Sequence, residues 1–512
     1  MQDDYDVVIL GGAFSGSTCA VLLKREMPEL RIAIVEKALH FDRKVGEATT
    51  EVSGCFLTKR LGLAHHLTHH HIQKQGLRFW FNNKPDDKFE DVGELGSYYQ
   101  VRLPSYQVDR EVLDAYLLEL AVKQGTDLLR PAKTVGVELD ESGGRSTVEV
   151  EQDGVRRKLT ARWVIDASGR AAVLTRKLGL LKPVPEHPTN AIWARFRNVQ
   201  DWDSYEFRER FPEYARTCQT SRAAATNHLT GYGWWCWIIP LKGGDYSAGL
   251  VYDSRLYTPP EGAKIEDRLK AHLLANPVGR ELFENSEAIP GDSRAYSSLP
   301  YVADKIAGPG WQIVGDAAGF MDPLYSQGLE YCSWTVSCAV ERILAESKGV
   351  TVDYADINKR FGMSYRGWFE AIYKDKYYYL GDAELMGTAF MLDLALFFIG
   401  PVRDLCGNPR RGLSRFPFDG PVDGAIGKFM KFYNKRLSII AQKRKAAGVY
   451  GASNLGTRML VGNFEPTFMI RKNLFKGLRM WLKAEWKSKG LAMPKAVEAP
   501  MKQPEPAVAG AN

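Results

Sequence analysis

The first 36 residues alternate apolar runs with a glycine-rich stretch. Residues 5–10 and 31–35 are largely apolar, as expected for short strands in a buried parallel sheet. Between them, Cys19 and Leu22 recur at helical spacing after the glycines at 11–16. The pattern predicts a strand, a tight turn, a helix and a second strand, which together form a βαβ unit.

The turn of this unit carries the pattern of a dinucleotide site. Glycines let the backbone approach a pyrophosphate, and the following helix points its free N–H groups at it. Ala13 stands where the G-x-G-x-x-G fingerprint has its second glycine, which is the smallest departure. Glu36 lies twenty residues beyond Gly16, where a carboxylate accepts ribose hydroxyls. The predicted site comprises Gly11, Gly12, Ala13, Phe14, Ser15, Gly16, Glu36 and Lys37.

Four further runs predict a second sheet that would form a substrate layer beside the first. They are residues 77–81, 191–196, 234–240 and 246–252. The third run, W-W-C-W-I-I-P, alternates large apolar side chains with both faces buried. It ends at Pro240, which has no N–H for a β-ladder. It is either a strand of a sandwich core or an indole wall between the nucleotide site and a second site.

From about residue 347 the pattern becomes helical, with many aromatic side chains at 361–380. The most apolar run, 389–400, is about a dozen residues long and contains Asp393, so we expect it to be too short to span a bilayer. Residues after about 492 are rich in Pro and Ala, which predicts disorder.

The C-terminal region is strongly basic. Residues 428–489 hold fifteen Lys or Arg against Glu465 and Glu485. Within this region, residues 468–489 predict a basic amphipathic helix. Its apolar positions are Ile470, Leu474, Leu478, Trp481, Leu482 and Trp486. The apolar stripe suits an internal cap helix, whereas the excess charge suits an anionic partner, either an acyl-carrier protein or a membrane surface.

Composition narrows the class of protein. The chain of 512 residues is 45% hydrophobic and 25% charged, enough for two or three domains around a large core. Its seven Cys include no C-x-x-C pair, which argues for a reducing compartment and against a disulfide framework or zinc site. The acidic N-terminus runs directly into a strand and is not a signal peptide, so we expect a cytoplasmic protein. The net charge of +7 is modest, and we expect no nucleic-acid partner.

Three later blocks decide between FAD and NAD. A helix opens at Val108-Asp109-Arg110, one strand ends in the turn D-A-S-G at 166–169, and another ends in G-D at 315–316. Their order is similar to that of the aromatic-hydroxylase superfamily of flavoproteins. The resemblance implies that Asp316 binds the ribityl chain of FAD and that Arg110 lies by the pyrophosphate.

The segment after the second strand extends the predicted cofactor site. Gly46, Glu47 and Ala48 stand where flavoproteins of this superfamily contact FAD, and the resemblance implies the same role here. We see no second dinucleotide fingerprint in the sequence. Reduced flavin is therefore expected from a separate flavin reductase.

The run at 234–240 gives a more specific resemblance. Trp235, Trp237, Ile239 and Pro240 form W-x-W-x-I-P, which is the hallmark of the flavin-dependent halogenases at this place in the chain. The resemblance implies that these residues line a channel that keeps the substrate away from the flavin. Hypohalous acid, formed from halide with reduced FAD and O₂, would travel along this channel.

One lysine matches the residue that such a channel leads to. Halogenases carry a K-x-G-x-x-F-x-W-like strand, which Lys74, Gly76 and Phe79 match, while Trp80 comes one position early. The resemblance implies that Lys74 is catalytic and presents the halogen to an aromatic ring. A lysine suits this task because burial lowers its pKa, so that it serves as hydrogen-bond donor or nucleophile.

The loop after the G-D turn, residues 322–328, resembles the halide-binding loop of the same family. The resemblance assigns the halide to the backbone amides of Gln327 and Gly328, places Gly328 against the flavin and puts Ser326 in the channel. Tryptophan halogenases read P-L-E-S-T here, with a catalytic glutamate, whereas this chain has Tyr325. The difference favours a phenol or pyrrole substrate, and the sequence does not identify the base that would deprotonate it.

Five histidines lie just before Lys74, at positions 65, 66, 69, 70 and 71. Their i,i+4 spacing is compatible with metal binding, but no nearby carboxylate or Cys completes a ligand set. We therefore expect a solvated or site-flanking helix and no metal site.

The sequence predicts an α/β protein with a FAD-binding Rossmann-like domain, an inserted β-sheet substrate layer and a C-terminal helical cap. The expected boundaries are 1–345 for the FAD domain, about 76–105 and 185–295 for its inserts, 346–490 for the cap and 491–512 for a disordered tail. We expect a halogenase that acts on a free or carrier-bound aromatic. Two alternatives stay open: a monooxygenase or isoprenoid-type reductase on the same fold, and a non-catalytic flavoprotein that binds an aromatic ligand or carrier protein.

Overall fold

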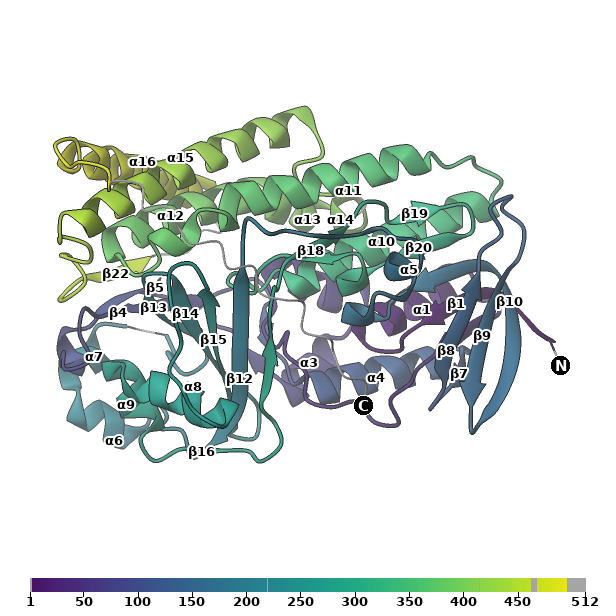
Figure 1. The fold of residues 1–512 in the computed structure, drawn as a ribbon, viewed down its shortest axis with the longest axis horizontal. Helices are drawn as coiled ribbons and strands as arrows, with labels where there is room; N and C mark the ends of the chain where they lie inside the picture. The colour runs from purple at the N-terminus through teal and green to yellow at the C-terminus, as the bar shows by residue number, and fades with distance from the viewer. Residues whose placement is uncertain (1, 219, 414, 462–466, 495–512) are drawn as a thin grey trace.

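Two sheets lie side by side beneath a layer of C-terminal helices (Figure 1). This computed structural model describes residues 2–218, 220–413, 415–461 and 467–494. The first sheet is formed mainly by the N-terminal third of the chain. Most strands of the second sheet come from segments that lie, in the sequence, between strands of the first sheet.

The first sheet contains the predicted βαβ unit. Its strands run in the order β19-β20-β10-β1-β2-β7, with β8 and β9 continuing from β10. Strand β1 pairs in parallel with β2 and β10, and β10 pairs in parallel with β20. The glycine-rich turn, the D-A-S-G turn and the G-D turn therefore meet at one edge, where the carboxyl ends of parallel strands lie together. The elements are β1 (Gln2–Leu10), α1 (Phe14–Glu26), β2 (Ile32–Val35), α4 (Arg110–Lys123), β7 (Asp127–Leu129), β8 (Lys133–Glu138), β9 (Ser146–Gln152), β10 (Val155–Asp166), β19 (Ala307–Gly308), β20 (Trp311–Ile313) and α10 (Gly328–Ser347).

The second sheet contains all four runs that the sequence predicts for it. Its order is β16-β12-β15-β14-β13-β4-β5-β22, and β17 also pairs with β12. The strands are β4 (Leu77–Phe81), β5 (Gly93–Ser97), β12 (Thr189–Arg197), β13 (Thr226–Gly231), β14 (Trp234–Pro240), β15 (Tyr246–Asp253), β16 (Glu287–Ala288), β17 (Arg294–Tyr296) and β22 (Arg458–Val461).

Strand β14 is buried on both faces, as its alternation predicts. Trp235, Trp237 and Ile239 face the main core, which this sheet shares with the first sheet and the cap. Cys236 and Ile238 face a second, smaller core. That core is closed by α6 (Tyr205–Arg210), α7 (Pro212–Arg216), α8 (Ile265–Leu274) and α9 (Pro277–Phe283), at the lower left of Figure 1.

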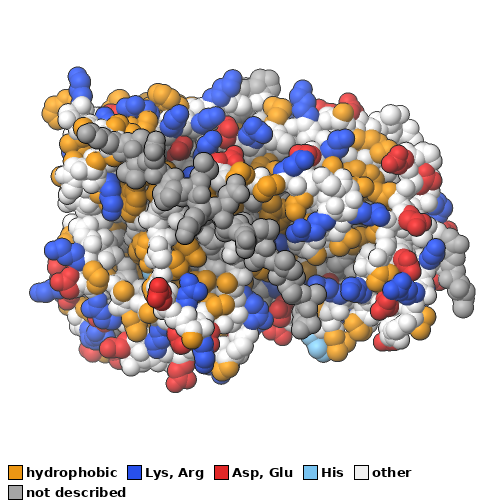
Figure 2. All heavy atoms as spheres, in the orientation of Figure 1, with side chains coloured by type: hydrophobic (Ala, Val, Ile, Leu, Met, Phe, Trp, Pro, Cys, Tyr) orange, Lys and Arg blue, Asp and Glu red, His pale blue; other side chains and the backbone are white. Residues whose placement is uncertain are grey.

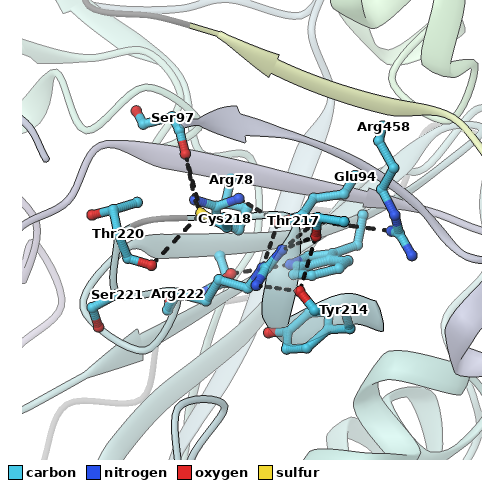
Figure 3. A network of polar contacts seen from close by, with 12 residues as sticks. Arg78, Glu94, Ser97, Tyr214, Thr217, Cys218, Thr220, Ser221, Arg222 and Arg458 are labelled. Carbon is cyan, nitrogen blue, oxygen red and sulfur yellow. Dashed lines mark hydrogen bonds and ion pairs between the residues drawn. The ribbon is translucent and has the colours of Figure 1, made fainter. Parts of the chain in front are cut away.

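The C-terminal region is not purely helical, because β22 adds a strand to the edge of the second sheet. It pairs in parallel with β5. A buried network of ion pairs secures this addition (Figure 3). The Glu94 carboxylate of β5 binds Arg78 of β4 and Arg222, and Arg458 of β22 approaches the same carboxylate to 3.8 Å.

The rest of the C-terminal region forms the helical cap. Its helices are α11 (Tyr354–Trp368), η5 (Phe369–Tyr373), η6 (Lys376–Tyr378), α12 (Ala383–Phe397), η7 (Phe398–Val402), α13 (Arg403–Gly407), α14 (Pro409–Leu413), α15 (Pro421–Ala446) and α16 (Thr467–Lys487). Helix α16 packs against α12 and α15 along the upper left of Figure 1.

The apolar run of the cap belongs to a longer helical stretch than the sequence pattern suggests. Residues 383–407 form a run of 25 residues that is helical apart from a kink at Gly400. Its most apolar 18-residue window has a mean hydropathy of 1.8, which satisfies the length and composition of a membrane span. Of its most apolar window, 72% is buried inside the protein, as in the core helix of a folded domain. Most of the predicted disordered tail, from 495 onward, lies outside the described residues.

Shorter elements connect these layers. They are α2 (Glu51–Cys55), η1 (Phe56–Arg60), α3 (Ala64–His70), β3 (Ile72–Gln73), η2 (Phe89–Asp91), β6 (Tyr106–Gln107), η3 (Gly169–Ala171), α5 (Val173–Lys177), β11 (Leu181–Pro183), β18 (Tyr301–Ala303), η4 (Gly315–Ala317) and β21 (Gly319–Phe320).

Candidate active site

The predicted dinucleotide loop has the tight geometry that its glycines allow. Gly11 has a φ of +100°, and a Cβ on Gly16 would lie 1.9 Å from the Gly11 carbonyl oxygen. Helix α1 follows at once, and its N-cap residue, Ala13, provides no side-chain cap. The first N–H groups of α1 are therefore free to face an anion. Glu36 stands beside the loop, where its Oε2 accepts from the Gly12 amide at 2.7 Å.

Arg110 and Asp316 lie at the same edge of the sheet. The Arg110 guanidinium binds Asp114, donates to the Val45 carbonyl at 3.3 Å and lies over the Phe14 ring. A Cβ on Gly46 would approach Arg110 to 2.8 Å, so this glycine allows the contact. Burial raises the pKa of Asp316, against the opposing charge of Arg110. Within the described residues, the Asp316 carboxylate receives no side-chain or backbone hydrogen bond, which fits a partner such as a ribityl hydroxyl.

Two of the predicted cofactor residues lie differently from the rest. Lys37 is exposed, next to the buried Glu36. The Glu47 carboxylate is buried and forms an ion pair at 2.7 Å with Arg195 of β12 in the second sheet. Its backbone carbonyl accepts from Val108. Glu47 thus ties the 44–48 segment to both the second sheet and the start of α4.

Lys74 lies in a cavity of about 90 Å³ between the second sheet, the 322–328 loop and the cap. The lysine is buried, and its Nζ donates to the Thr49 carbonyl at 2.9 Å and to the Ser326 hydroxyl at 3.4 Å. The other walls are mostly apolar and aromatic: Trp368, Ile372, Phe390, Leu394, Phe397, Phe398 and Val461. A cavity of this kind suits an aromatic substrate.

Burial lowers the pKa of Lys74 to about 8, and the nearby Glu51 partly opposes that shift. At neutral pH a useful fraction of the side chain is therefore an uncharged amine, while the rest is an ammonium that can donate hydrogen bonds. This is the property that the sequence pattern predicts for the residue.

The 322–328 loop is fixed in place by cap residues. Tyr377 donates to the Asp322 carboxylate at 2.7 Å, and Tyr373 donates to the Gln327 side chain at 2.5 Å. Ser326 has a φ of +61°, which is rare outside glycine, and Gln327 follows in a right-handed helical conformation. Successive left- and right-handed residues turn their N–H groups inward as an anion nest, here at the start of α10.

Tyr325 takes part in a buried charge network. Its hydroxyl donates to Asp393 and accepts from Lys376, each at 3.1 Å, and Lys376 pairs with Asp393 at 2.6 Å. Tyr433 also donates to Asp393, at 2.5 Å. Asp393 interrupts an otherwise apolar run in the sequence, and a buried charge in such a run is a signal for a polar network.

The two indoles of the W-x-W-x-I-P strand lie close to each other, with ring centres 5.9 Å apart. Trp235 donates to the Tyr377 hydroxyl at 2.9 Å, and Trp237 donates to Ser247. Neither indole lines the cavity that contains Lys74. Both belong to the main core, and Trp235 supports the 322–328 loop through Tyr377, which binds Asp322.

Sequence analysis did not assign any of the cavity carboxylates to the site, and Glu330 is the most buried of them. Glu330, in the first turn of α10, is fully buried and lines the cavity with Lys74. The sequence gives one clue to this role, because Glu330 lies two residues beyond the predicted flavin and halide residue Gly328. A glutamate in the first turn of a helix more often only stabilises the helix N-terminus, so the clue is not specific. Thr50 and Glu51, which also line the cavity, follow directly after the predicted cofactor segment.

The histidine cluster lies on and beside α3. His66 is buried and stacks on Tyr116, whereas His65 stacks on His69 near the surface. Within the described residues, no group of three or more potential ligands is arranged to hold a metal ion.

Helix α16 exposes apolar as well as basic side chains. Ile470 and Ala484 are buried, but Leu482 and Trp486 are exposed by 65% and 79%, so the predicted apolar stripe does not lie wholly inside. Phe468 and Phe475 are also exposed. Figure 2 shows apolar and basic side chains next to each other along this upper edge of the molecule. A groove beside α16, lined by Val461, Met469, Lys472, Phe475, Lys476, Arg479, Met480 and Lys483 among others, shares Val461 with the Lys74 cavity.

The fold and the nucleotide edge define a FAD-binding flavoprotein with a separate substrate cavity. The family model described as tryptophan halogenase matches residues 6–104 and 85–374. The chain therefore belongs to the tryptophan halogenase family, and its class is that of the flavin-dependent halogenases, which are oxidoreductases.

Individual relatives agree with this assignment. The flavin-dependent halogenase chlA of Dictyostelium discoideum is 26% identical over 428 residues, which are 77% of this chain and 69% of that protein. The 1H-pyrrole-2-carbonyl-(peptidyl-carrier protein) chlorinase of Pseudomonas fluorescens is 26% identical over 408 residues, 76% of this chain and 86% of that protein. The chain spans only 63% of the tetracycline 7-halogenase of Kitasatospora aureofaciens.

The fold is also that of solved halogenase structures. The halogenase PltM, in complex with phloroglucinol and FAD, superimposes with a TM-score of 0.72 at 18% identity, covering 94% of this chain and 96% of that one. The flavin-dependent halogenase CmlS gives a TM-score of 0.59 at 19% identity and covers 95% of this chain and 78% of that one.

Proposed function

We propose that the protein halogenates an electron-rich aromatic, a phenol or a pyrrole, with hypohalous acid that Lys74 delivers. The observation that carries this proposal is the buried Lys74 in an aromatic-lined cavity beside the 322–328 loop. Tyr325 stands where tryptophan-specific relatives carry glutamate, which favours the phenol or pyrrole class. Among the similar structures, one holds phloroglucinol, which is a phenol.

The residues of the nucleotide edge fit FAD. The α1 N-terminus and Arg110 would hold its pyrophosphate, Glu36 its ribose, and Asp316 its ribityl chain. When bound in reduced form, FAD supplies the electrons that convert O₂ and halide into hypohalous acid. We infer that a separate flavin reductase delivers it reduced, because the sequence has one dinucleotide fingerprint.

In the cavity, the chain's own residues would position the halogen and the ring. The nest at the start of α10 offers the backbone N–H groups of Gln327 and Gly328 to a halide, since the Ser326 N–H is bound to the Pro323 carbonyl. The Lys74 ammonium can donate to the oxygen of hypohalous acid, and the uncharged amine can accept the halogen as a haloamine. The aromatic walls exclude water and hold the substrate ring near Nζ.

We also propose that the substrate is presented by an acyl-carrier protein that docks on α16. The groove beside α16 shares Val461 with the Lys74 cavity, so a carrier docked in the groove would stand next to that cavity. Carrier proteins are acidic, and the groove is lined by Lys472, Lys476, Arg479 and Lys483. Two relatives are named for pyrrole substrates on peptidyl-carrier proteins.

The test is an incubation of the protein with FAD, a flavin reductase and bromide or chloride. Phenols and pyrroles are offered free and on a carrier protein, and products are identified by mass spectrometry. We expect a halogenated ring that depends on halide. A hydroxylated or reduced product that forms equally without halide would assign the protein to the monooxygenase or reductase alternative.

A further inference from the structure

Three carboxylates line the Lys74 cavity: Glu51, Asp393 and Glu330. If the proposed halogenation takes place on a phenol, one group must accept the hydroxyl proton, because a phenolate ring is far more nucleophilic than a phenol ring. The contacts and the burial of the three carboxylates indicate which of them can accept this proton.

Asp393 is already saturated with donors. Its Oδ2 accepts from Lys376 and Tyr325, and its Oδ1 accepts from Tyr433 and Asn434. An ammonium and three further donors therefore already occupy both oxygens of Asp393, which leaves no open position for a substrate hydroxyl. Glu51, at the start of α2, is only half-buried and remains open to solvent.

Glu330 has the opposite character. The side chain is fully buried, and its Oε2 accepts one hydrogen bond, from the Thr50 hydroxyl at 2.6 Å. Its Oε1 is buried and has no hydrogen-bond partner within the described residues. Leaving a buried acceptor unpaired costs about 1–3 kcal/mol, which a ligand O–H at that atom would recover.

We propose that Glu330 is the catalytic base of this enzyme and that its Oε1 takes the hydroxyl proton of a phenol substrate. This inference rests on the proposed halogenation and narrows its substrate class to phenols, since a carboxylate does not deprotonate a neutral pyrrole N–H. The phenol loses its proton to Glu330, and a ring carbon of the phenolate attacks the halogen of hypohalous acid. The oxygen–halogen bond breaks, and the hydroxide leaves as water after it takes a proton from the Lys74 ammonium. The neutral Lys74 amine then takes the proton from the same ring carbon, and Glu330 returns its proton to the product.

The surroundings of Glu330 match its pKa to this task. Burial raises the pKa of Glu330 to about 8, the Thr50 hydrogen bond opposes the shift, and the charge of Glu51 adds to it. The other titratable groups of the cavity are Lys74, Tyr325 and Asp393, and Tyr373 and Tyr331 also lie close enough to interact with the carboxylate. A base whose pKa lies near the working pH combines sufficient basicity with a sufficient deprotonated fraction.

The test compares Glu330→Gln with Glu341→Gln. Both changes lie on α10, but Glu341 is outside the cavity, in a half-exposed ion pair with Arg410. Gln keeps an acceptor for Thr50. Two phenols are used: p-cresol, which is neutral at the assay pH, and p-nitrophenol, assayed above its pKa as the anion.

For Glu330→Gln we expect a loss of kcat on p-cresol of about 10²-fold or more, as for removal of a general base. On ionised p-nitrophenol, kcat should hardly change and KM should fall, because a like charge has been removed. Glu341→Gln should behave as the unsubstituted protein on both phenols. Equal losses on both phenols in Glu330→Gln would show that Glu330 supports the cavity structurally, and would overturn the proposal.

A second measurement does not depend on turnover. When p-nitrophenolate binds to the FAD-loaded protein, its negative charge lies beside the Glu330 carboxylate. Because two such charges repel each other, Glu330 should take up a proton on binding. Calorimetry in two buffers of different ionisation enthalpy measures this uptake. It should occur in the unsubstituted protein and in Glu341→Gln, and vanish in Glu330→Gln. If the unsubstituted protein takes up the proton but halogenates no phenol, the proposed function is refuted while Glu330 remains the proton acceptor. If the uptake persists in Glu330→Gln, Glu330 is not the proton acceptor and the inference is refuted.

Discussion

The Nζ of Lys74 donates a hydrogen bond to the hydroxyl of Ser326 at 3.4 Å. One residue comes from the segment that leads into the second sheet, and the other from the loop that begins α10 in the FAD domain. The contact places the proposed halogen carrier directly against the proposed halide loop. Because Tyr373 and Tyr377 of the cap hold the same loop, all three layers of the fold fix the geometry of this cavity.

Lys74→Met should abolish halogenation while FAD binding and the consumption of O₂ by reduced FAD continue. Methionine fills a similar volume but offers neither an ammonium nor an amine, so hypohalous acid is not passed to the ring. Product mass spectrometry and oxygen uptake measure the two parts separately. Halogenated product at the unsubstituted rate would remove Lys74 from the mechanism.

Asp316→Ala should chiefly weaken the retention of FAD. The Asp316 carboxylate lies beside Arg110 at the nucleotide edge without a hydrogen-bond partner among the described residues, so the lost partner would be a ligand hydroxyl. The FAD content after gel filtration and the Kd for added FAD report the effect, and the melting temperature without FAD should change little. A variant that purifies fully loaded would contradict the assigned position of the ribityl chain.

Glu94→Gln should destabilise the fold by about 3–5 kcal/mol, because it leaves buried guanidinium groups without a counter-charge. Burial alone would raise the pKa of Glu94, but Arg78 and Arg222 lower it below its ordinary value. Urea unfolding measures the loss, and Glu90→Gln, at an exposed position in η2 between β4 and β5, is the control. A change in Glu94→Gln as small as that of the control would show that water or backbone groups satisfy the arginines.

Glu330→Gln should become more stable than the unsubstituted protein as the pH rises. The pKa of Glu330 is raised to about 8 in the folded state from an ordinary value of 4.5. Between about pH 5 and pH 8 the folded state therefore binds more protons than the unfolded state, and its stability falls with increasing pH. Glutamine does not titrate, so the gain should grow by up to ~1.4 kcal/mol per pH unit in this window and level off above it. Parallel pH curves for the two proteins would mean that the carboxyl is not perturbed.

Sequence patterns located the local features of this fold more reliably than its long-range contacts. The βαβ unit, β14 and the second-sheet strands follow from apolar periodicity within short windows, and Pro240 ends β14 as expected. Glu330 could not be recognised as part of the cavity because its partner, Thr50, lies 280 positions away. Strand β22 joins the sheet through an edge that no local pattern marks.

Helix α16 illustrates a second limit. Its helical character and basic face follow from residue spacing, but its apolar residues occupy more than one face. Ile470 points inward, whereas Phe475 and Trp486 point outward. Periodicity identifies an amphipathic helix, and only packing against α12 and α15 decides which apolar side chains remain exposed.

The last prediction concerns this exposed face of α16. Reversal of Arg471, Lys472, Lys476 and Arg479 to Glu should strongly slow halogenation of a carrier-bound phenol. Each basic residue near an anionic surface contributes up to ~1 kcal/mol at low salt, and the reversal turns that attraction into repulsion. Turnover of a small free phenol should hardly change, because the substituted side chains lie outside the Lys74 cavity.

Two comparisons make this prediction specific. Reversal of Lys123, Lys133, Arg156 and Lys158, exposed cations of the FAD domain, changes the net charge equally and should leave the carrier reaction intact. Phe475→Ser with Trp486→Ser removes the exposed apolar contacts alone and should impair the carrier reaction at high salt, where the charge effect is screened. Equal loss on free and carrier-bound phenol, with a lower melting temperature, would show that α16 is only structural. A different result would favour a membrane surface as the partner of α16 instead of a carrier protein. In that case the unsubstituted protein would bind anionic lipid vesicles, and the α16 reversal would abolish this binding without affecting the carrier reaction.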